Sequence, residues 1–267
     1  MPASNAREPT ILGVVNLSPE SNVPGSHAGN LEAVLNRSRK LKRQGADIIE
    51  LGARSISADR SKINDTIEMK RLEDPLTVLI EEGYKVAVDT WSNQTALFAL
   101  EKRVDFINFT GSHPSEEVFK KVAEYNARIC LLYLPYTNPY TMRESNLVTY
   151  DGSLIIEYFQ KILEKLTGFH THQIILDPNL GIFHPDLKIQ MKIALQIQAI
   201  QCINSLSTLG NPILAYLARK KEYTSRLLIA AQLATTKIDY IRTHEPRIFR
   251  QAWIEKTKIY NNNSING

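Results

Sequence analysis

Polar side chains that can bind a charged or heterocyclic ligand follow most of the short apolar runs in this 267-residue chain. They comprise two carboxylates, two amides and a set of basic groups: Asp89 and Asp177, Asn16 and Asn108, and Arg219, Lys220, Arg242 and His244. A lone Asp or Asn at the end of a strand usually caps a turn or a helix. Because six of the eight apolar runs end in this way, we interpret these residues as one convergent site.

Four of these residues suit a heterocycle that carries N–H donors and a carbonyl. The oxygens of Asp89, Asn108 and Asp177 can accept from ring and exocyclic N–H groups, and the Asn amide can also donate. Lys220 can donate to a ring carbonyl or nitrogen. This set therefore predicts the binding site for a polar ring.

The remaining residues suit an anion. Arg242 and His244, with Arg219 beside them, form a cationic cluster typical of a phosphate or diphosphate site. Asn16 can add one oxygen to a Mg²⁺ ion that bridges phosphate oxygens, since Mg²⁺ retains most of its waters and needs few protein ligands.

The elements that must position these residues alternate along the chain. Eight apolar runs read as buried parallel strands: Ile11–Val15, Asp47–Leu51, Lys85–Asp89, Phe106–Phe109, Arg128–Tyr133, Gln173–Asp177, Pro212–Leu217 and Tyr240–Arg242. Helical patterns lie between them: Leu31–Gln44, Glu116–Tyr125, Ser153–Leu166, Leu187–Leu206 and Thr224–Thr236.

This alternation predicts a single α/β domain, a (β/α)₈ barrel over residues 1–267, with its core at about 10–257 and a polar tail at 261–267. In such a barrel the C-terminal ends of the strands meet on one face, which would bring the polar residues together. The alternative, a doubly wound open sheet, usually carries G-x-G-x-x-G or G-x-x-x-x-G-K-[ST] after a strand, and neither pattern is present.

Composition excludes several other classes of protein. Hydrophobic residues make up 43% and charged residues 22%, which is typical of a soluble enzyme with a substantial core. A net charge of +4 is too small to indicate nucleic-acid binding, and no run is long and apolar enough to predict a membrane span. The first residues lack the apolar segment of a secretory signal, and Cys130 and Cys202 read as reduced thiols, so we expect a cytoplasmic protein.

The motifs around the polar residues resemble those of dihydropteroate synthases, which are pterin-binding barrels. The segments N-L-S-P-E-S (16–21), G-A-D-I-I-E-L-G (45–52), V-D-T (88–90), I-N-F (107–109), D-P-N-L-G (177–181), A-R-K (218–220) and R-T-H (242–244) are similar to the family's N-x-T-P-D-S, G-A-D-I-I-D-I-G, I-D-T, I-N-D, D-P-G-x-G, S-R-K and R-V-H. They occur in the family's order from about residue 10 to residue 246.

The resemblance implies a transferase of folate biosynthesis. It would condense 6-hydroxymethyl-7,8-dihydropterin diphosphate with p-aminobenzoate, release diphosphate and use Mg²⁺. The family pattern assigns pterin binding to Asp89, Asn108, Asp177 and Lys220, and diphosphate and metal binding to Asn16, Arg242 and His244. Of these, Asn16, Lys220, Arg242 and His244 would be catalytic. The partners would be these small molecules, and members of the family often pair as homodimers through outer helices.

The departures from the family cluster in the two loops that would cover the second substrate. These loops contain Ser21 after the first strand and Ser55, Ile56 and Ser57 after the second, where Ile56 and Ser57 replace the family's Thr and Arg. Arg219 would lie on the same side, next to an Ala in place of the family's Ser. Two alternatives therefore stay open: a paralogue that joins the pterin to another amine or turns over poorly, and a pterin-barrel methyltransferase or folate-binding module.

Overall fold

Eight parallel strands form the centre of the computed structural model, which describes residues 7–21, 25–56, 63–145, 151–166, 171–218 and 222–265. They are β1 (Thr10–Asn16), β2 (Ile48–Gly52), β3 (Val86–Thr90), β4 (Phe106–Phe109), β5 (Arg128–Leu132), β6 (Ile174–Asp177), β7 (Leu214–Leu217) and β8 (Tyr240–Thr243). The strand order is β6-β5-β4-β3-β2-β1-β8-β7. A parallel bridge between Leu176 and Ile213 joins the two ends, so the sheet closes into a barrel.

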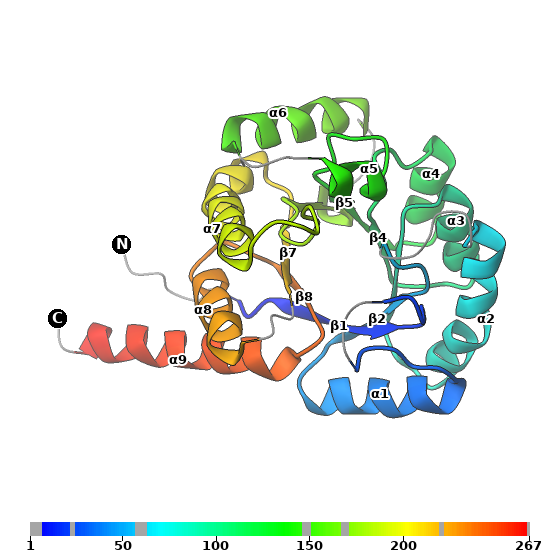
Figure 1. Cartoon of the computed structure of the whole chain (residues 1–267), viewed down its shortest axis with the longest axis horizontal. Helices are drawn as coiled ribbons and strands as arrows, with labels where there is room; N and C mark the ends of the chain where they lie inside the picture. The colour runs from blue at the N-terminus through cyan, green and yellow to red at the C-terminus, as the bar shows by residue number, and fades with distance from the viewer. Residues whose placement is uncertain are drawn as a thin grey trace.

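Helices surround the strands, as Figure 1 shows. They are α1 (Leu31–Arg43), α2 (Asp65–Glu81), α3 (Asn93–Glu101), α4 (Glu116–Glu124), α5 (Pro139–Glu144), α6 (Gly152–Leu163), α7 (Ile189–Leu206), α8 (Tyr223–Ala234) and α9 (Pro246–Ile265), with short 3₁₀ turns at Glu164–Leu166, Thr171–Gln173 and Ser207–Leu209. Several begin at a side chain that accepts from a backbone N–H of the first turn, such as Asn30 for α1, Asn64 for α2 and Ser115 for α4. Such caps satisfy donors that the helix leaves unpaired, and thus mark where the helix begins.

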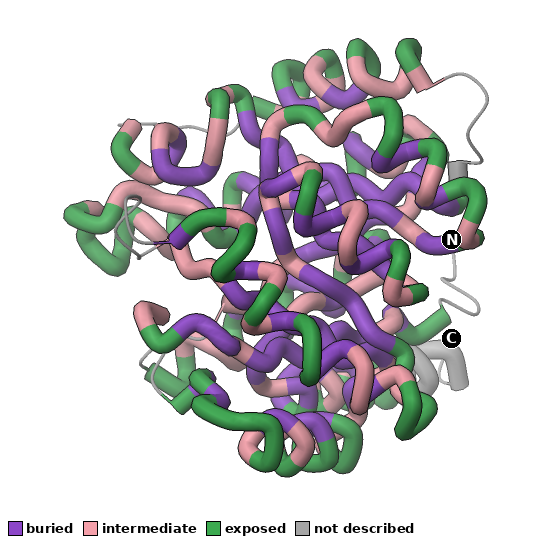
Figure 2. The backbone as a smooth tube through the Cα atoms, turned by 90° about the vertical axis from the view of Figure 1, so that its right-hand side faces the viewer, coloured by how far each residue is buried: buried purple, intermediate pink, exposed green. Residues whose placement is uncertain are grey.

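Most strand residues are buried and apolar, and Figure 2 shows buried residues gathered in the interior of the molecule. The outer face packs beneath the helices. The inner face begins with one layer that takes a residue from every strand: Leu12, Ile48, Ala87, Phe106, Cys130, Ile175, Leu214 and Tyr240. This layer fills the barrel interior, and the polar residues follow it toward the C-terminal ends of the strands.

The structure confirms the predicted barrel. Each predicted apolar run is a strand, with ends within two residues of those expected. Helices α2, α3, α5 and α9 were not predicted; α2 contains Pro75, a residue that usually breaks a helix interior. The polar tail continues α9 as far as Ile265, so its first part is helical. None of the helices in the described ranges combines the length and the apolar character needed to cross a membrane.

Candidate active site

A second inward-facing layer lies two residues beyond the apolar one on every strand. It consists of Val14, Glu50, Asp89, Asn108, Leu132, Asp177, Tyr216 and Arg242. Residues i and i+2 of a strand share a face, so the inner wall changes from apolar to polar within one step along the strands. All of this layer except Glu50 lines a pocket of about 240 Å³, together with Asn16 and His244 from the level above.

Six of the predicted site residues are thus brought together by the barrel. They are Asn16, Asp89, Asn108, Asp177, Arg242 and His244. Ser21, Ser55 and Ile56 line the same pocket. Lys220, Arg219 and Ser57 lie outside the described residues, and their predicted roles stay predictions.

Arg242 is held between two carboxylates. Its Nε donates to Glu50 Oε1 at 2.5 Å, and one terminal nitrogen donates to Asp89 Oδ2 at 2.5 Å. Its guanidinium carbon lies 4.8 Å from the centre of the Tyr216 ring. The other oxygen of Asp89 accepts from the Thr110 hydroxyl at 3.0 Å. These contacts fix the guanidinium in one plane and orientation at the mouth of the barrel.

Glu50 and Tyr216 were not predicted as site residues. Glu50 has no exposed surface and contacts two predicted residues, Arg242 and Asn108. A signal for both was present in the sequence: each lies at the same inward register as Asp89 and Asn108, two residues after the apolar layer. The period-two alternation of a strand therefore marks both as inward-facing, but the apolar residues around them mask this pattern.

Asn108 is 1% exposed and contacts Glu50 through its amide. Its Nδ2 donates to Glu50 Oε2 at 3.3 Å. Its Oδ1 has no hydrogen-bond partner among the described residues, although the atom is buried. A buried carbonyl oxygen without a partner costs free energy of about 1–3 kcal/mol, so this atom is suited to accept from a ligand.

Asp177 ends β6 and organises the turn that follows. One oxygen accepts from the Asn179 backbone N–H at 2.7 Å. Asn179 has φ +67°, a left-handed conformation that a short polar side chain tolerates. The Asn179 side-chain oxygen accepts from the N–H groups of Gly181 and Ile182. The turn therefore holds the Asp177 carboxylate at the pocket wall.

Burial shifts the protonation equilibria of the two buried carboxyl groups. Desolvation raises the pKa of Glu50 to about 7; Arg242 opposes this shift and the nearby Asp89 adds to it. Desolvation likewise raises the pKa of Asp177 to about 7, against the hydrogen bond from Asn179. Burial works to lower the pKa of Arg242, but the carboxylates of Glu50 and Asp89 raise it above its ordinary range. Perturbed groups gathered in and around one pocket are typical of a functional site.

Asn16 lies at the end of β1 with its amide held by two serines. Its Nδ2 donates to Ser21 Oγ at 2.6 Å and to Ser26 Oγ at 3.0 Å. Both amide hydrogens are used in this way, which leaves Oδ1 for a ligand. No cluster of three His, Cys, Asp or Glu side chains in the described ranges is arranged to hold a metal, so a cation here would need substrate oxygens.

The first and second loops are joined to each other beside the pocket. Ser18 Oγ accepts from the Ser55 backbone N–H at 3.2 Å, and Arg71 pairs with Glu20 while donating to the Ala53 carbonyl. Arg71 lowers the pKa of Glu20 to about 2. These contacts hold the two loops together at one wall of the pocket.

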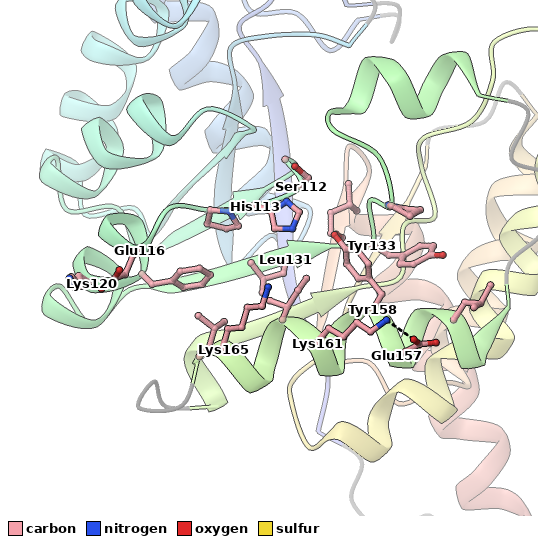
Figure 3. A pocket seen from close by; sticks show the side chains of 18 residues that line it. Ser112, His113, Glu116, Lys120, Leu131, Tyr133, Glu157, Tyr158, Lys161 and Lys165 are labelled. Atoms are coloured by element: carbon pink, nitrogen blue, oxygen red, sulfur yellow. Dashed lines mark hydrogen bonds and ion pairs between the residues drawn. The ribbon is translucent and has the colours of Figure 1, made fainter.

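A larger cavity, of about 900 Å³, lies outside the barrel between α4 and α6 (Figure 3). Its walls are largely apolar, with Tyr133 and Tyr158 facing it and lysines at its edge. None of the predicted site residues lines it, and Leu132 is the single described residue common to both cavities. The convergent polar groups therefore identify the smaller pocket as the chemical site.

Comparisons with known proteins agree with this geometry. Residues 12–237 match the family model described as "Pterin binding enzyme". The chain is 27% identical over 259 residues to dihydropteroate synthase type-3 of Escherichia coli, and the alignment covers 91% of this chain and 96% of that protein. It is 25% identical over 257 residues to the type-2 enzyme of the same organism, with 90% and 92% covered.

Solved structures show the same fold. The Yersinia pestis dihydropteroate synthase with a sulfonamide drug complex superposes with a TM-score of 0.78 at 20% identity, covering 97% of this chain and 95% of that one. The Coxiella burnetii dihydropteroate synthase in complex with pteroic acid gives a TM-score of 0.78 at 19% identity, covering 96% and 95%.

Proposed function

The chain belongs to the family of pterin-binding enzymes, and from this premise we propose that it is a dihydropteroate synthase-type transferase of folate synthesis. It joins 6-hydroxymethyl-7,8-dihydropterin diphosphate to p-aminobenzoate and releases diphosphate. The observation that carries the proposal is one pocket lined by the acceptors Asp89, Asn108 and Asp177 and by the cationic Arg242. These groups match the two halves of such a substrate. Relatives of similar length bearing the name dihydropteroate synthase support the same reaction.

The acceptor side of the pocket recognises the pterin. Pterin presents ring N–H and exocyclic NH₂ groups on one edge, and carboxylate and amide oxygens accept from them. Asp177 and Asn108 are almost fully buried, so a ligand that failed to supply these donors would leave them unsatisfied. Lys220, which follows β7 in the sequence, would donate to a ring carbonyl or nitrogen.

The cationic side stabilises the leaving group. The bond between the pterin methylene carbon and the diphosphate oxygen breaks, and the electron pair leaves with the diphosphate. The amine nitrogen of p-aminobenzoate then bonds to that carbon and loses its proton to the surrounding solvent. Arg242 and His244 hold the negative charge that develops on diphosphate, and their fixed positions avoid reorganisation during the reaction.

The residues around Asn16 fit a magnesium ion that the substrate brings with it. Asn16 Oδ1 is the oxygen left over after its amide binds Ser21 and Ser26. A single amide oxygen together with phosphate oxygens and waters is a donor set that Mg²⁺ accepts. When bound, the ion would neutralise charge on the diphosphate.

The test is diphosphate release by the purified chain. Release is expected only when both the pterin diphosphate and p-aminobenzoate are present. Asp177→Asn should abolish release, because an acceptor for the pterin donors becomes a donor, whereas the exposed Asp186→Asn should leave it unchanged.

Three other results would redirect the proposal. Pterin diphosphate that binds without release would identify a paralogue that turns over poorly. Release with a different amine would identify another second substrate. Binding of methyl-tetrahydrofolate that does not depend on diphosphate would support a methyltransferase or a folate-binding module.

A further inference from the structure

Glu50 contacts two residues that line the pocket, Asn108 and Arg242. It has no exposed surface, and it does not line the cavity. One carboxylate oxygen accepts from Arg242 Nε at 2.5 Å, and the other accepts from Asn108 Nδ2 at 3.3 Å. Both oxygens of Glu50 are thus used on residues that line the pocket.

The chemistry of these three groups determines which end of the Asn108 amide faces Glu50. An ionised carboxylate only accepts hydrogen bonds, and the contact with the Arg242 guanidinium favours the ionised form. Asn108 must therefore turn its NH₂ group toward Glu50 and its carbonyl oxygen away. That carbonyl oxygen, Oδ1, is the buried acceptor without a partner among the described residues.

We propose that Glu50 is a specificity-determining positioning residue, which orients the Asn108 amide so that the pocket presents a hydrogen-bond acceptor to the ligand at that position. This inference rests on the proposed function, because it identifies the ligand group that Asn108 receives as an N–H donor of the pterin. With Asp89 and Asp177 also lining it, the pocket then presents several hydrogen-bond acceptors and favours heterocycles with a donor-rich edge.

Glu50→Gln tests the orientation directly. The glutamine oxygen can keep the bond to Arg242 Nε, and its NH₂ group then faces Asn108. The Asn108 amide turns round to accept from it and presents its own NH₂ to the ligand. At about pH 8, where Glu50 is ionised, calorimetry with 6-hydroxymethylpterin should show affinity at least about tenfold weaker than for the unmodified protein, since one hydrogen bond is mismatched.

A second substitution should restore binding. In Glu50→Gln with Asn108→Asp, residue 108 has two acceptor oxygens, one for the glutamine NH₂ and one for the ligand. Affinity within about threefold of the unmodified protein is expected. A purely structural role for Glu50 predicts no such rescue. The matched control is Gln173→Met, which removes a buried side chain that donates to the Ala127 carbonyl far from the pocket; it should lower the melting temperature without changing pterin affinity.

A neutron structure of the unmodified protein keeps the inference testable if the variants do not fold. Deuterium on Asn108 Nδ2 directed at Glu50 supports it, and a protonated Glu50 that donates to Asn108 Oδ1 at the same pH overturns it. Unchanged pterin affinity in Glu50→Gln, or no rescue by the double variant, also overturns it. If only the proposed function is wrong, the unmodified protein releases no diphosphate, but Glu50→Gln still lowers the affinity for pterin. A protein that binds no pterin would overturn both.

Discussion

The guanidinium of Arg242 donates to the carboxylate of Asp89 at 2.5 Å, although the two side chains were assigned to opposite halves of the substrate. The sequence places them 153 residues apart, and the barrel brings them together because β3 and β8 flank β2 and β1. The pterin side and the diphosphate side of the pocket are therefore one electrostatic unit. A change of charge on either side should therefore change the affinity for both halves of the substrate.

Asp89→Asn should affect the two ligand halves in opposite directions. Pterin affinity should fall about tenfold or more, because a charged acceptor becomes a partly donating amide. Affinity for inorganic diphosphate should rise, because a negative charge next to Arg242 is removed. Calorimetry with each ligand alone measures both. The control is Asp239→Asn, because the Asp239 carboxylate accepts from the Ile213 N–H at the other end of the barrel. Equal losses of affinity for both ligands in Asp89→Asn would contradict the coupling.

Arg242→Lys should weaken diphosphate binding and destabilise the fold. A lysine cannot reach Glu50 and Asp89 with two fixed nitrogens, and breaking a buried ion pair costs about 3–5 kcal/mol. The expected result is a higher diphosphate Kd and a lower free energy of unfolding, measured by calorimetry and urea titration. Arg250→Lys is the comparison, since Arg250 binds Asp47 and the Gly45 carbonyl at the opposite end of the strands. It should lower stability without changing diphosphate affinity.

The free energy of unfolding should fall as pH rises from about 5 to about 7. Burial raises the pKa of Glu50, Asp177 and Glu68 to about 7 from ordinary values of 4.5, 3.8 and 4.5. Over this window the folded chain keeps protons that the unfolded chain has already released, so each unit of rise in pH lowers the free energy of unfolding. The lowered pKa of Glu20 adds no slope here, because its stabilisation is complete above about 4.5.

Urea unfolding at several pH values measures this slope. Glu50→Gln should reduce it, because one of the three groups no longer titrates. A stability that stays constant or increases between about pH 5 and pH 7 would contradict the role of the buried carboxyl groups.

Asn16→Ala should raise the Mg²⁺ concentration needed for half-maximal diphosphate release. The substitution removes the amide oxygen that is left after binding Ser21 and Ser26, while Arg242 and His244 remain. Ser26→Ala removes one of the two bonds that hold the amide and should have a smaller effect in the same direction. A magnesium dependence that is unchanged in Asn16→Ala would exclude Asn16 as a ligand.

The sequence by itself determined the order and nature of the elements. Strands buried on both faces require continuous apolar runs, and the alternation of eight such runs with helical segments admits few architectures besides a closed barrel. It also located Asp89, Asn108, Asp177 and Arg242, because a charged or amide side chain that ends an apolar run is conspicuous in one dimension. The motifs around them were sufficient to identify the family.

Only the tertiary structure decided how these groups interact. Glu50 lies inside an apolar run, and nothing local shows that it reaches Asn108 on β4 and Arg242 on β8. Those contacts depend on the closure and register of the barrel, which are set by packing between strands far apart in the chain. The same holds for the Asn108 oxygen, which has no partner in the described part of the chain, and for the raised pKa of Glu50. Burial and hydrogen-bond partners are properties of the assembled interior.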